Sequence, residues 1–482
     1  MNRRNYTVHF ALAAALVMFA ALAGQVSRWE SKRRAYVIGD LRPVPPRTLT
    51  VEPPRVAESF RGDADVLVRF REGVSEERIQ AIAARLNDRV EDEIESVNGL
   101  AAIDDLDGEQ AEEIVAEYAR LPEVEYAEPN FEIRTDPLEA TNSIRSRFVS
   151  SDTSNGPNDP MLSEQWGLIN TGQRDGTAGA DVSAGDAWER THGSKKVVVA
   201  VLDSGVDYTH PDLAGNIWHR PADMEMYFDR ELGVVDDYNG FSAVDSSGDP
   251  MDENGHGTHC AGIVGAEGDN NLGIAGVNWQ VEIMPLKFMG RGGFGSTKDA
   301  IEAINYVIER KKAGVNVRVI SASWGSRQKS KALEDVIRKA GEADILFVAA
   351  AGNDSMDADK TPHYPSNYKL PNVVSVAALD RTDKLASFSN YGAKSVHIAA
   401  PGREILSTWL DGGYEEHSGT SMATPFVAGV AGLVLSVEPN LSVKELRDRL
   451  FDSVDKTDSL RGKVSTGGRL NAARAVGATQ IK

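Results

Sequence analysis

The sequence has a single cysteine, Cys260, among 482 residues, so no disulfide bond can form within the chain. A protein without disulfide bonds obtains its stability from a large apolar core or from bound ions. Basic residues are fewer than acidic ones. The chain has 52 Lys and Arg and 72 Asp and Glu, which gives a net charge of −20. Because nucleic acids are polyanions and repel an acidic surface, we expect no nucleic-acid partner.

The apolar stretch near the N-terminus, residues 10–23, is shorter than the ~20 residues that a membrane-spanning helix needs. Arg3 and Arg4 precede it, and the small-x-small triplet ALA at 21–23 ends it, as in an export signal. We therefore predict a signal peptide over residues 1–24 and secretion of the protein. The alternative is an uncleaved membrane anchor through residues 7–24, because Arg28 and Lys32 follow the stretch.

The rest of the chain has the composition of a globular protein, with 41% hydrophobic and 26% charged residues. Its length predicts more than one domain. Stretches with proline and charge at residues 25–59, and with Ser, Thr, Asn and Asp at residues 135–157, predict linkers. Two folded segments are therefore expected, at residues 60–134 and at residues 158–482.

The segment 60–134 has short strands and two amphipathic helices. Strands are expected at residues 66–68, 90–94, 100–103 and 124–133. Ser75 opens the first helix, and the second helix runs over residues 111–118. The order β-α-β-β-α-β is the ferredoxin-like arrangement, an α+β fold that indicates no function by itself.

The segment 158–482 alternates continuous apolar strands with helices. Strand cores lie at residues 197–202, 283–287, 317–322, 345–350 and 373–378, and helices at residues 297–311, 330–340 and 424–437. This alternation predicts an α/β fold in which a parallel sheet is covered by helices on both faces. Functional residues of such sheets lie at the carboxyl ends of the strands.

Three glycine-rich motifs stand at such positions. In the first, 197–205 (VVVAVLDSG), an apolar strand ends in Asp203. The second, 254–262 (NGHGTHCAG), holds His256 between glycines at the start of a helix. The third, 419–429 (GTSMATPFVAG), puts Ser421 at the amino end of a buried helix with Pro425 in its first turn. The dipole and amides of that helix end favour an anion.

Each motif alone has an ordinary alternative. Asp203 suits a turn, and Ser421 suits a helix N-cap. His256 and His259 are three residues apart with Glu253 nearby, which suggests a zinc site. The zinc-protease helix, however, places two histidines four residues apart with a glutamate between them, and that glutamate is absent here.

Together, in the chain order Asp, His, Ser, the motifs resemble the subtilisin family of serine endopeptidases over roughly residues 158–478. The resemblance implies that Ser421 is the nucleophile, His256 the general base, and Asp203 the group that orients the imidazole. It also implies that Asn353 and the Ser421 N–H form the oxyanion hole. No catalytic cofactor is expected.

The same resemblance places an extended polypeptide substrate between two edge segments whose glycines leave backbone groups available for strand pairing. Trp324 replaces the leucine expected in the family and either narrows the specificity pocket or caps its wall, so no preferred side chain is predicted. The two segments are Gly293, Phe294 and Gly295 on one side and Ser323, Trp324 and Gly325 on the other.

Calcium is the ion expected in place of disulfide bonds, because thermitase-like relatives build a calcium site from two aspartates and a loop after the histidine motif. Oxygen ligands at six positions suit Ca²⁺ rather than zinc, and a solvated acidic loop is the alternative. The predicted ligands are the side chains of Asp159, Asp212 and Asn270 and the carbonyls of Glu267, Leu272 and Ile274. A further candidate set, which the sequence cannot resolve into ligands, is Asp236, Asp237, Asn239, Asp245, Asp249 and Asp252.

In the subtilisin family a prodomain with the split βαβ fold covers the enzyme. Residues 60–134 are therefore expected to act as an intramolecular inhibitor and chaperone of a self-processed zymogen, with the tail 128–134 in the cleft. Cys260 lies four residues after His256 and is expected to be an inert core thiol, similar to the thermitase branch in its position close to the triad. A monomer is expected. A catalytically silent binding protein with the same fold is the alternative function.

Overall fold

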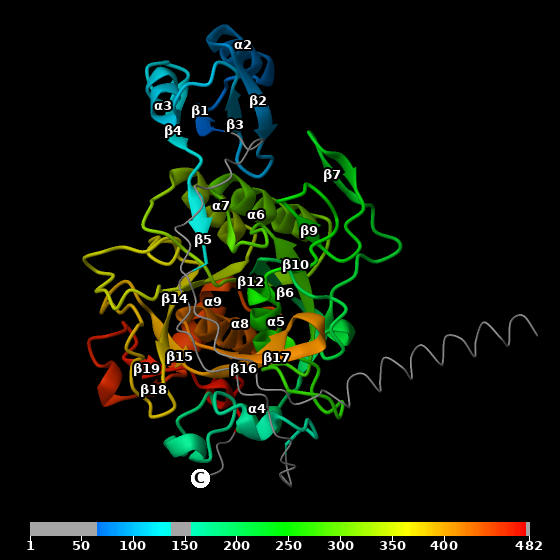
Figure 1. The fold of residues 1–482 in the computed structure, drawn as a ribbon, viewed down its shortest axis with the longest axis vertical. Helices are drawn as coiled ribbons and strands as arrows, with labels where there is room; N and C mark the ends of the chain where they lie inside the picture. The colour runs from blue at the N-terminus through cyan, green and yellow to red at the C-terminus, as the bar shows by residue number, and fades with distance from the viewer. Residues whose placement is uncertain (1–64, 136–155, 479–482) are drawn as a thin grey trace, which may run out of the picture. The chain divides into compact units, whose positions relative to one another are not determined.

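The computed structural model describes residues 65–135 and 156–478 (Figure 1). The signal peptide predicted at residues 1–24, the linker at 25–59 and most of the linker at 135–157 lie outside these residues. Within the described part of the chain, one helix, Thr420–Val437, is long and apolar enough to cross a membrane. Because 89% of its apolar window is buried inside the molecule, this helix belongs to the protein core.

The N-terminal region, residues 65–135, forms a four-stranded antiparallel sheet with the strand order β2-β3-β1-β4. Side chains of two helices, including Ile79, Ile82 and Ile114, pack on one face of this sheet. Ser75 caps the first helix by accepting a hydrogen bond from the N–H of Arg78, as the sequence predicts. The elements are β1 (Val66–Phe70), α2 (Glu76–Leu86), β2 (Asp88–Glu93), β3 (Leu100–Asp105), α3 (Ala111–Tyr118), β4 (Val124–Pro129) and β5 (Glu132–Arg134).

The order of elements in this region is confirmed, but the strand predicted at residues 124–133 is wrong in its extent. β4 ends at Pro129, and β5 leaves the small sheet to pair antiparallel with β11 (Phe294–Ser296) of the C-terminal region. A pairing partner so distant in sequence leaves no trace in local hydrophobic periodicity.

The C-terminal region is built around a nine-stranded sheet with the order β18-β19-β15-β14-β13-β12-β6-β10-β9. Every neighbouring pair in it is parallel except β18 with β19. Its strands are β6 (Gly193–Asp203), β9 (Phe241–Ser242), β10 (Gln280–Lys287), β12 (Val317–Ala322), β13 (Leu346–Ala350), β14 (Val373–Leu379), β15 (Ile398–Pro401), β18 (Asp455–Lys456) and β19 (Gly468–Arg469).

The helices of this region are α4 (Ala184–Trp188), α5 (His256–Gly265), α6 (Thr297–Lys312), α7 (Lys331–Glu342), α8 (Thr420–Val437), α9 (Val443–Asp452) and α10 (Ala472–Ala475). The predicted strands and helices are confirmed with one shift. The helix predicted at residues 424–437 begins at Thr420, so Pro425 lies one turn further inside it than expected.

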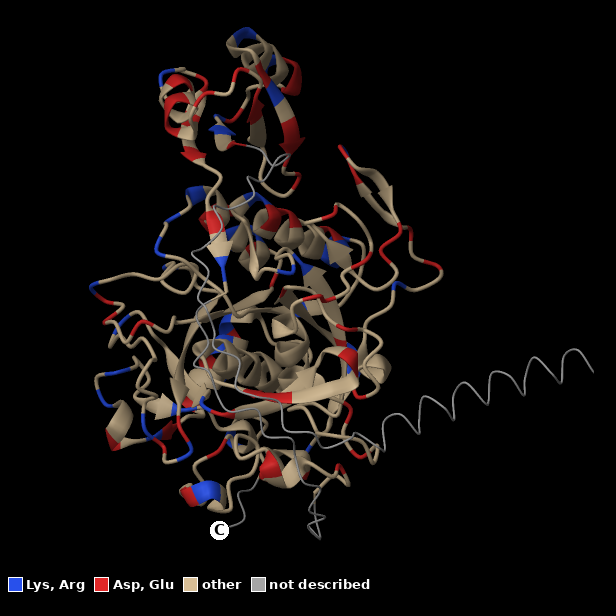
Figure 2. Ribbon diagram, in the orientation of Figure 1, with Lys and Arg blue, Asp and Glu red and all other residues tan. Residues whose placement is uncertain are grey.

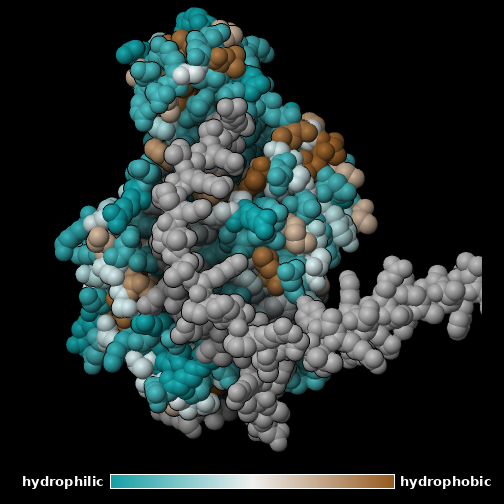
Figure 3. Space-filling view, viewed as in Figure 1, coloured by the Kyte–Doolittle hydropathy of each residue, from teal (hydrophilic) through white to brown (hydrophobic). Residues whose placement is uncertain are grey.

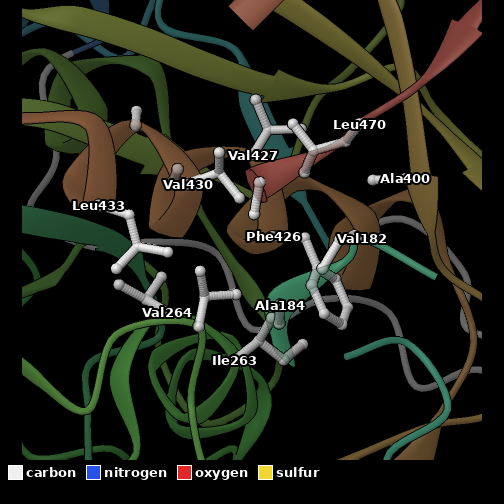
Figure 4. Close-up of a cluster of buried hydrophobic side chains, with 14 of the residues drawn as sticks. Val182, Ala184, Ile263, Val264, Ala400, Phe426, Val427, Val430, Leu433 and Leu470 are labelled. Carbon is white, nitrogen blue, oxygen red and sulfur yellow. The ribbon is translucent and has the colours of Figure 1, made fainter. Parts of the chain in front are cut away.

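Helices cover both faces of the large sheet, as predicted. Val199 and Val201 of β6 pack into the cluster that contains α5 and α8, whereas Val198 and Leu202 pack into the cluster that contains α6 and α7. Successive side chains of a strand point to opposite faces, so one strand serves two cores. Figure 4 shows the first cluster, with side chains of α8 beside those of α5.

Two further two-stranded ribbons lie outside the large sheet. One consists of β7 (Tyr227–Asp229) and β8 (Gly233–Val235), and the other of β16 (Ile405–Trp409) and β17 (Gly413–His417). Phe228 and Val234 on the first ribbon are 64% and 68% exposed, and Figure 3 shows apolar surface gathered there.

Candidate active site

Neighbouring strands of the large sheet end beside one another and bring the candidate residues to one edge. β6 ends at Asp203, its neighbour β12 is followed directly by Ser323, and the next strand, β13, leads into the turn that holds Asn353. The sheet topology therefore gathers residues that are far apart in the sequence, as the carboxyl-edge rule predicts.

His256 is the first residue of α5 and lies against Asp203. Its Nδ1 is 2.7 Å from Asp203 Oδ1, and both side chains are almost fully buried. An ionised carboxylate only accepts hydrogen bonds, so this contact places the imidazole proton on Nδ1 and gives Nε2 the lone pair when the ring is neutral. Asp203 Oδ1 also accepts a hydrogen bond from the Ser204 N–H, at 2.8 Å, which fixes the carboxylate.

A glycine makes the start of α5 possible. Gly255, the N-cap, has φ 103°, a left-handed conformation that favours glycine. A Cβ added there would lie 2.5 Å from Cζ2 of Trp409. Gly255 therefore permits both the turn and the close approach of the β16 ribbon.

Ser421 lies in the first turn of α8, whose N-cap is Gly419. The alternative in which Ser421 is only an N-cap is thus wrong, because the N-cap is Gly419 and Ser421 is the second residue of the helix. Its Oγ donates a hydrogen bond to the carbonyl oxygen of Ser323, at 3.0 Å. The serine hydroxyl is therefore held at the same edge as Asp203 and His256.

Pro425 explains how the Ser421 carbonyl is used. A helical residue at position 425 would donate its N–H to the carbonyl of Ser421, but proline has no N–H. That carbonyl instead accepts from Ser323 Oγ at 2.8 Å and from Cys260 Sγ at 3.6 Å. The proline thereby connects the first turn of α8 to β12 and α5.

Asn353 is oriented by the residue that precedes the serine. Both the N–H and the Oγ1 of Thr420 donate to Asn353 Oδ1, each at 2.9 Å. With Oδ1 engaged in this way, the amide nitrogen Nδ2 is the donor that Asn353 presents. The position of Thr420 beside Ser421 is the only sequence signal for this positioning role, and the sequence analysis missed it.

The zinc alternative is not supported. His259 is fully buried, and its Nε2 lies 3.1 Å from the carbonyl oxygens of both Ile405 and Glu415. Asp203, His256 and Cys260 do place ligand-type atoms within 4.8 Å of one another. However, burial and the Asp203 charge raise the pKa of the Cys260 thiol well above its usual value, and a protonated thiol is a poor metal ligand. Cys260 is a buried core thiol, as expected.

The groove segments predicted from the sequence are joined by the tail of the N-terminal region. β5 pairs with β11 so that Ile133 lies opposite Gly295 and Arg134 opposite Phe294. The backbone of Arg134 also pairs with Gly325 in an isolated antiparallel β-bridge. The Thr135 N–H donates to the Gly293 carbonyl at 2.9 Å. The tail therefore runs as a strand between the two segments.

Trp324 does not line this groove with its side chain. The indole is fully buried, its Nε1 donates to the Leu202 carbonyl at 2.9 Å, and it packs against Phe288 and Phe347. The indole therefore fills the core behind the groove. Only the backbone of Trp324 remains available beside Ser323 and Gly325.

Residues of the same tail cap two helices of the C-terminal region. Glu128 accepts hydrogen bonds at the start of α7 from Ser330 Oγ and from the N–H groups of Lys331 and Ala332, at 2.5, 2.8 and 3.0 Å. Asn130 Oδ1 accepts from the Lys298 N–H in the first turn of α6, at 2.9 Å. The first N–H groups of a helix have no partner within the helix, so the tail supplies acceptors for both.

Three of the predicted calcium ligands lie together. Asn270 Nδ2 is 2.7 Å from Asp212 Oδ1, and Asp159 Oδ2 accepts from the Asp269 N–H at 2.8 Å. Among the described residues, Asp159 Oδ1 is buried and receives no hydrogen bond. Burial, followed by the charge of Asp212, raises the pKa of Asp159 to about 6. Two buried carboxylates and an acceptor without a donor suit a hard cation.

The loop around these side chains also closes on Asp212. The Ile274 N–H donates to Asp212 Oδ2 at 2.9 Å, and the Glu267 N–H donates to the Asp212 carbonyl at 2.8 Å. Asn270 presents its amide nitrogen to Asp212, while its oxygen accepts from the Leu272 N–H at 2.7 Å. As a ligand, Asn270 would instead turn its amide oxygen toward a cation held beside Asp212.

Two members of the second acidic set have partners within the protein. Asp237 is buried against the guanidinium groups of Arg220 and Arg310, so cations of the protein already compensate its charge. Asp252 instead accepts hydrogen bonds from Thr258 and from the N–H groups of Asn254 and Gly255 at the start of α5.

At one edge of a parallel sheet covered by helices, the structure thus brings an Asp–His pair together with a serine in the first turn of a helix. Residues 194–477 match the model of the subtilase family, and residues 63–130 match that of the fervidolysin N-terminal prodomain. The chain therefore belongs to the subtilase family and is a serine endopeptidase with an N-terminal prodomain.

Similar proteins agree with this assignment. The thermophilic serine proteinase of Bacillus sp. (strain AK1) is 34% identical over 86% of this chain and 87% of its own length. Thermitase of Thermoactinomyces vulgaris is 35% identical over 66% of this chain and 99% of its own length. Subtilisin-like protease 1 of Plasmodium falciparum (isolate 3D7) is 33% identical over 66% of this chain and 47% of its own length.

Proposed function

We propose that this endopeptidase cleaves peptide bonds through Asp203, His256 and Ser421, and that it is exported as an inhibited, self-processed zymogen. The observation that best supports the proposal is the 2.7 Å contact between His256 Nδ1 and Asp203 Oδ1 beside the serine in the first turn of α8. A catalytically silent binding protein would need neither this orientation of the imidazole nor a serine in the first turn of α8.

In the proposed reaction, Ser421 Oγ turns from the Ser323 carbonyl toward His256 Nε2 and attacks the peptide carbonyl carbon. His256 takes the hydroxyl proton and then gives it to the leaving amine, which breaks the C–N bond and leaves an acyl-enzyme. Water then attacks the acyl-enzyme ester. His256 takes a proton from this water and returns it to Ser421 Oγ, which frees the carboxylic acid product. Asp203 holds the ring in the required tautomer and stabilises its charged form.

The oxyanion of each tetrahedral intermediate needs donors that are already in place. Asn353 Nδ2 and the N–H of Ser421 are the proposed donors. Thr420 supports this role because its two hydrogen bonds to Asn353 Oδ1 hold the amide before substrate arrives. The dipole of α8 adds to the stabilisation of negative charge at its amino end.

Polypeptide substrates are proposed to add a strand between the segments 293–295 and 323–325. The tail of the prodomain supports this use of the groove, because β5 pairs with β11 in the same manner. The prodomain then inhibits by occupying the groove, and the capping contacts of Glu128 and Asn130 hold it there.

Calcium is proposed as a structural ion held by Asp159, Asp212 and the loop from Glu267 to Ile274. The ion would compensate two buried carboxylates, which otherwise repel each other. The support is the buried Asp159 Oδ1, which lacks a donor among the described residues.

A fluorophosphonate probe tests the assignment of the nucleophile. We expect Ser421 Oγ to displace fluoride from phosphorus and form a stable phosphonate ester, which peptide mass mapping locates. Ser421→Ala should take no label, whereas Ser442→Ala, at the start of α9, should label like the parent chain. A label at another residue, or equal labelling of Ser421→Ala, would contradict the mechanism.

A further inference from the structure

A continuous apolar core joins the prodomain to the catalytic region. Leu67, Ile94 and Leu100 of the prodomain belong to the same buried cluster as Ile301 and Ile304 of α6. Charged groups inside such a core are costly unless they are paired or neutralised. The contact between prodomain and enzyme is therefore sensitive to any ionisable group that it encloses.

Two carboxyl groups meet inside this contact. Asp92 lies on β2 of the prodomain and Glu302 on α6, and they are 5% and 6% exposed. The charge of Asp92 acts on Glu302. A buried carboxylate that lacks a hydrogen-bond donor is costly when ionised, and a bound proton removes that cost.

Both carboxyl groups have an oxygen that no hydrogen-bond donor of the described chain reaches. Among the described residues, neither Asp92 Oδ1 nor Glu302 Oε1 receives a hydrogen bond from an N–H or hydroxyl group. Asn305, one turn along α6, is already engaged, because its amide binds Glu95 at 2.7 Å and the Ser96 N–H at 2.9 Å. The contact therefore encloses carboxyl oxygens whose ionised form no hydrogen bond from the described residues stabilises.

The charges that surround the pair are mostly negative, and Figure 2 shows acidic residues on both β2 and α6. Lys298 of α6 is the neighbouring cation, and its Nζ lies 3.5 Å from Glu91 Oε1, so Asp92 and Glu302 share it with another carboxylate. The charged groups facing the pair are Glu91, Glu93 and Glu95 from the prodomain, Asp229, Glu231 and Arg230 from the β7–β8 ribbon, and Lys298 and Asp299 from α6.

Burial, followed by the charge of Asp92, raises the pKa of Glu302 well above its usual value. Burial also raises the pKa of Glu95. When the prodomain leaves, these carboxyls return to water, where such groups titrate near ~4. The docked state therefore binds protons that the separated state releases.

We propose that the Asp92–Glu302 pair is a proton-dependent contact, so that docking of the prodomain takes up a proton and rising pH releases the prodomain. This regulation rests on the inhibitory role proposed for the prodomain. Because the pKa of Glu302 is raised on docking, the stabilisation is complete below the undocked pKa and is lost as pH rises through the docked one. Latency is thus strongest in mildly acidic solution and weakens toward alkaline pH.

Hydrogen–deuterium exchange of the full-length Ser421→Ala chain measures how the opening between prodomain and enzyme depends on pH, and it needs no catalytic activity. The amide of Ser96, bonded to Asn305 across the contact, reports local opening between prodomain and enzyme. After correction for the intrinsic exchange rate, one linked proton raises the opening constant up to about tenfold per pH unit. We expect such a rise at pH values above the undocked pKa of ~4.

In Glu302→Gln the side-chain amide donates a hydrogen bond to Asp92 and carries no titrating proton. The opening constant of this variant should therefore rise less steeply with pH than that of the parent, by up to about a factor of ten per pH unit. Any slope that remains belongs to Glu95 and Glu128, whose pKa values are also raised by burial. Glu309→Gln, two turns along α6 and paired with Lys312, should behave like the parent.

Asp92→Asn tests the pair from the prodomain side and serves if Glu302→Gln fails to fold. An opening constant independent of pH in the parent would overturn the proposal. So would a slope that is the same in the parent, Glu302→Gln and Asp92→Asn. Failure of Ser421 to take the fluorophosphonate probe would refute the catalytic assignment alone, because the exchange experiment does not depend on it.

Discussion

At the scale of single residues, the site depends on side chains that hold other side chains. Thr420 fixes Asn353, Ser204 fixes Asp203, and Ser323 binds both the hydroxyl and the carbonyl of Ser421. Motif matching predicts the reacting groups, because their types and order are distinctive. It does not identify Thr420, since a threonine beside a serine is unremarkable until the fold brings Asn353 to it.

Asn353→Ala should lower kcat by about 10²–10³, as expected for the loss of one oxyanion donor, with little change in KM. The oxyanion exists only in the transition state and the intermediates, so ground-state binding is not affected. Steady-state kinetics on a chromogenic peptide checks this. A loss confined to KM would instead assign Asn353 to substrate binding.

At the scale of elements, the sequence predicts the parallel strands and helices well, because each is a long apolar or amphipathic run. Two boundaries are wrong for identifiable reasons. Pro425 suggested a helix start, but α8 begins at Thr420 because the carbonyl that proline leaves without a partner is satisfied by Ser323 and Cys260. β5 was merged with β4 because its partner β11 lies in the other region.

The two helices capped by the prodomain give a prediction at this scale. Glu128→Ala removes three hydrogen bonds at the start of α7, which should weaken docking by roughly 1–2 kcal/mol. Activity should then appear earlier in a time course of zymogen activation. Glu125→Ala is the control, because Glu125 is exposed and only pairs with Lys331. Equal activation times for the parent and Glu128→Ala would show that the caps contribute nothing to latency.

At the scale of the whole molecule, stability comes from cores on both faces of one sheet and, we propose, from calcium. An ion bound only by the folded state stabilises it by roughly 2.7 kcal/mol at a hundredfold excess over Kd. A chelator should therefore lower the Tm of the full-length Ser421→Ala chain, and calcium but not zinc should restore it.

Asp212→Asn should reduce this response to chelation, because it removes one charge from the carboxylate pair. Asp458→Asn, at an exposed aspartate that pairs with Arg461, should leave the response unchanged. Calorimetric melts with and without chelator that superimpose for the parent would show that no structural ion is bound.

The pairing of β5 with β11 has a consequence for where the enzyme works. While groove and tail belong to one polypeptide, the effective concentration of the tail is set by the tether and not by the amount of protein. If the proposed self-processing separates the prodomain from the catalytic region, the same pairing becomes an encounter between two molecules, and its occupancy falls on dilution. Export into a large volume would then activate the enzyme, whereas in a confined space the same molecules would remain silent.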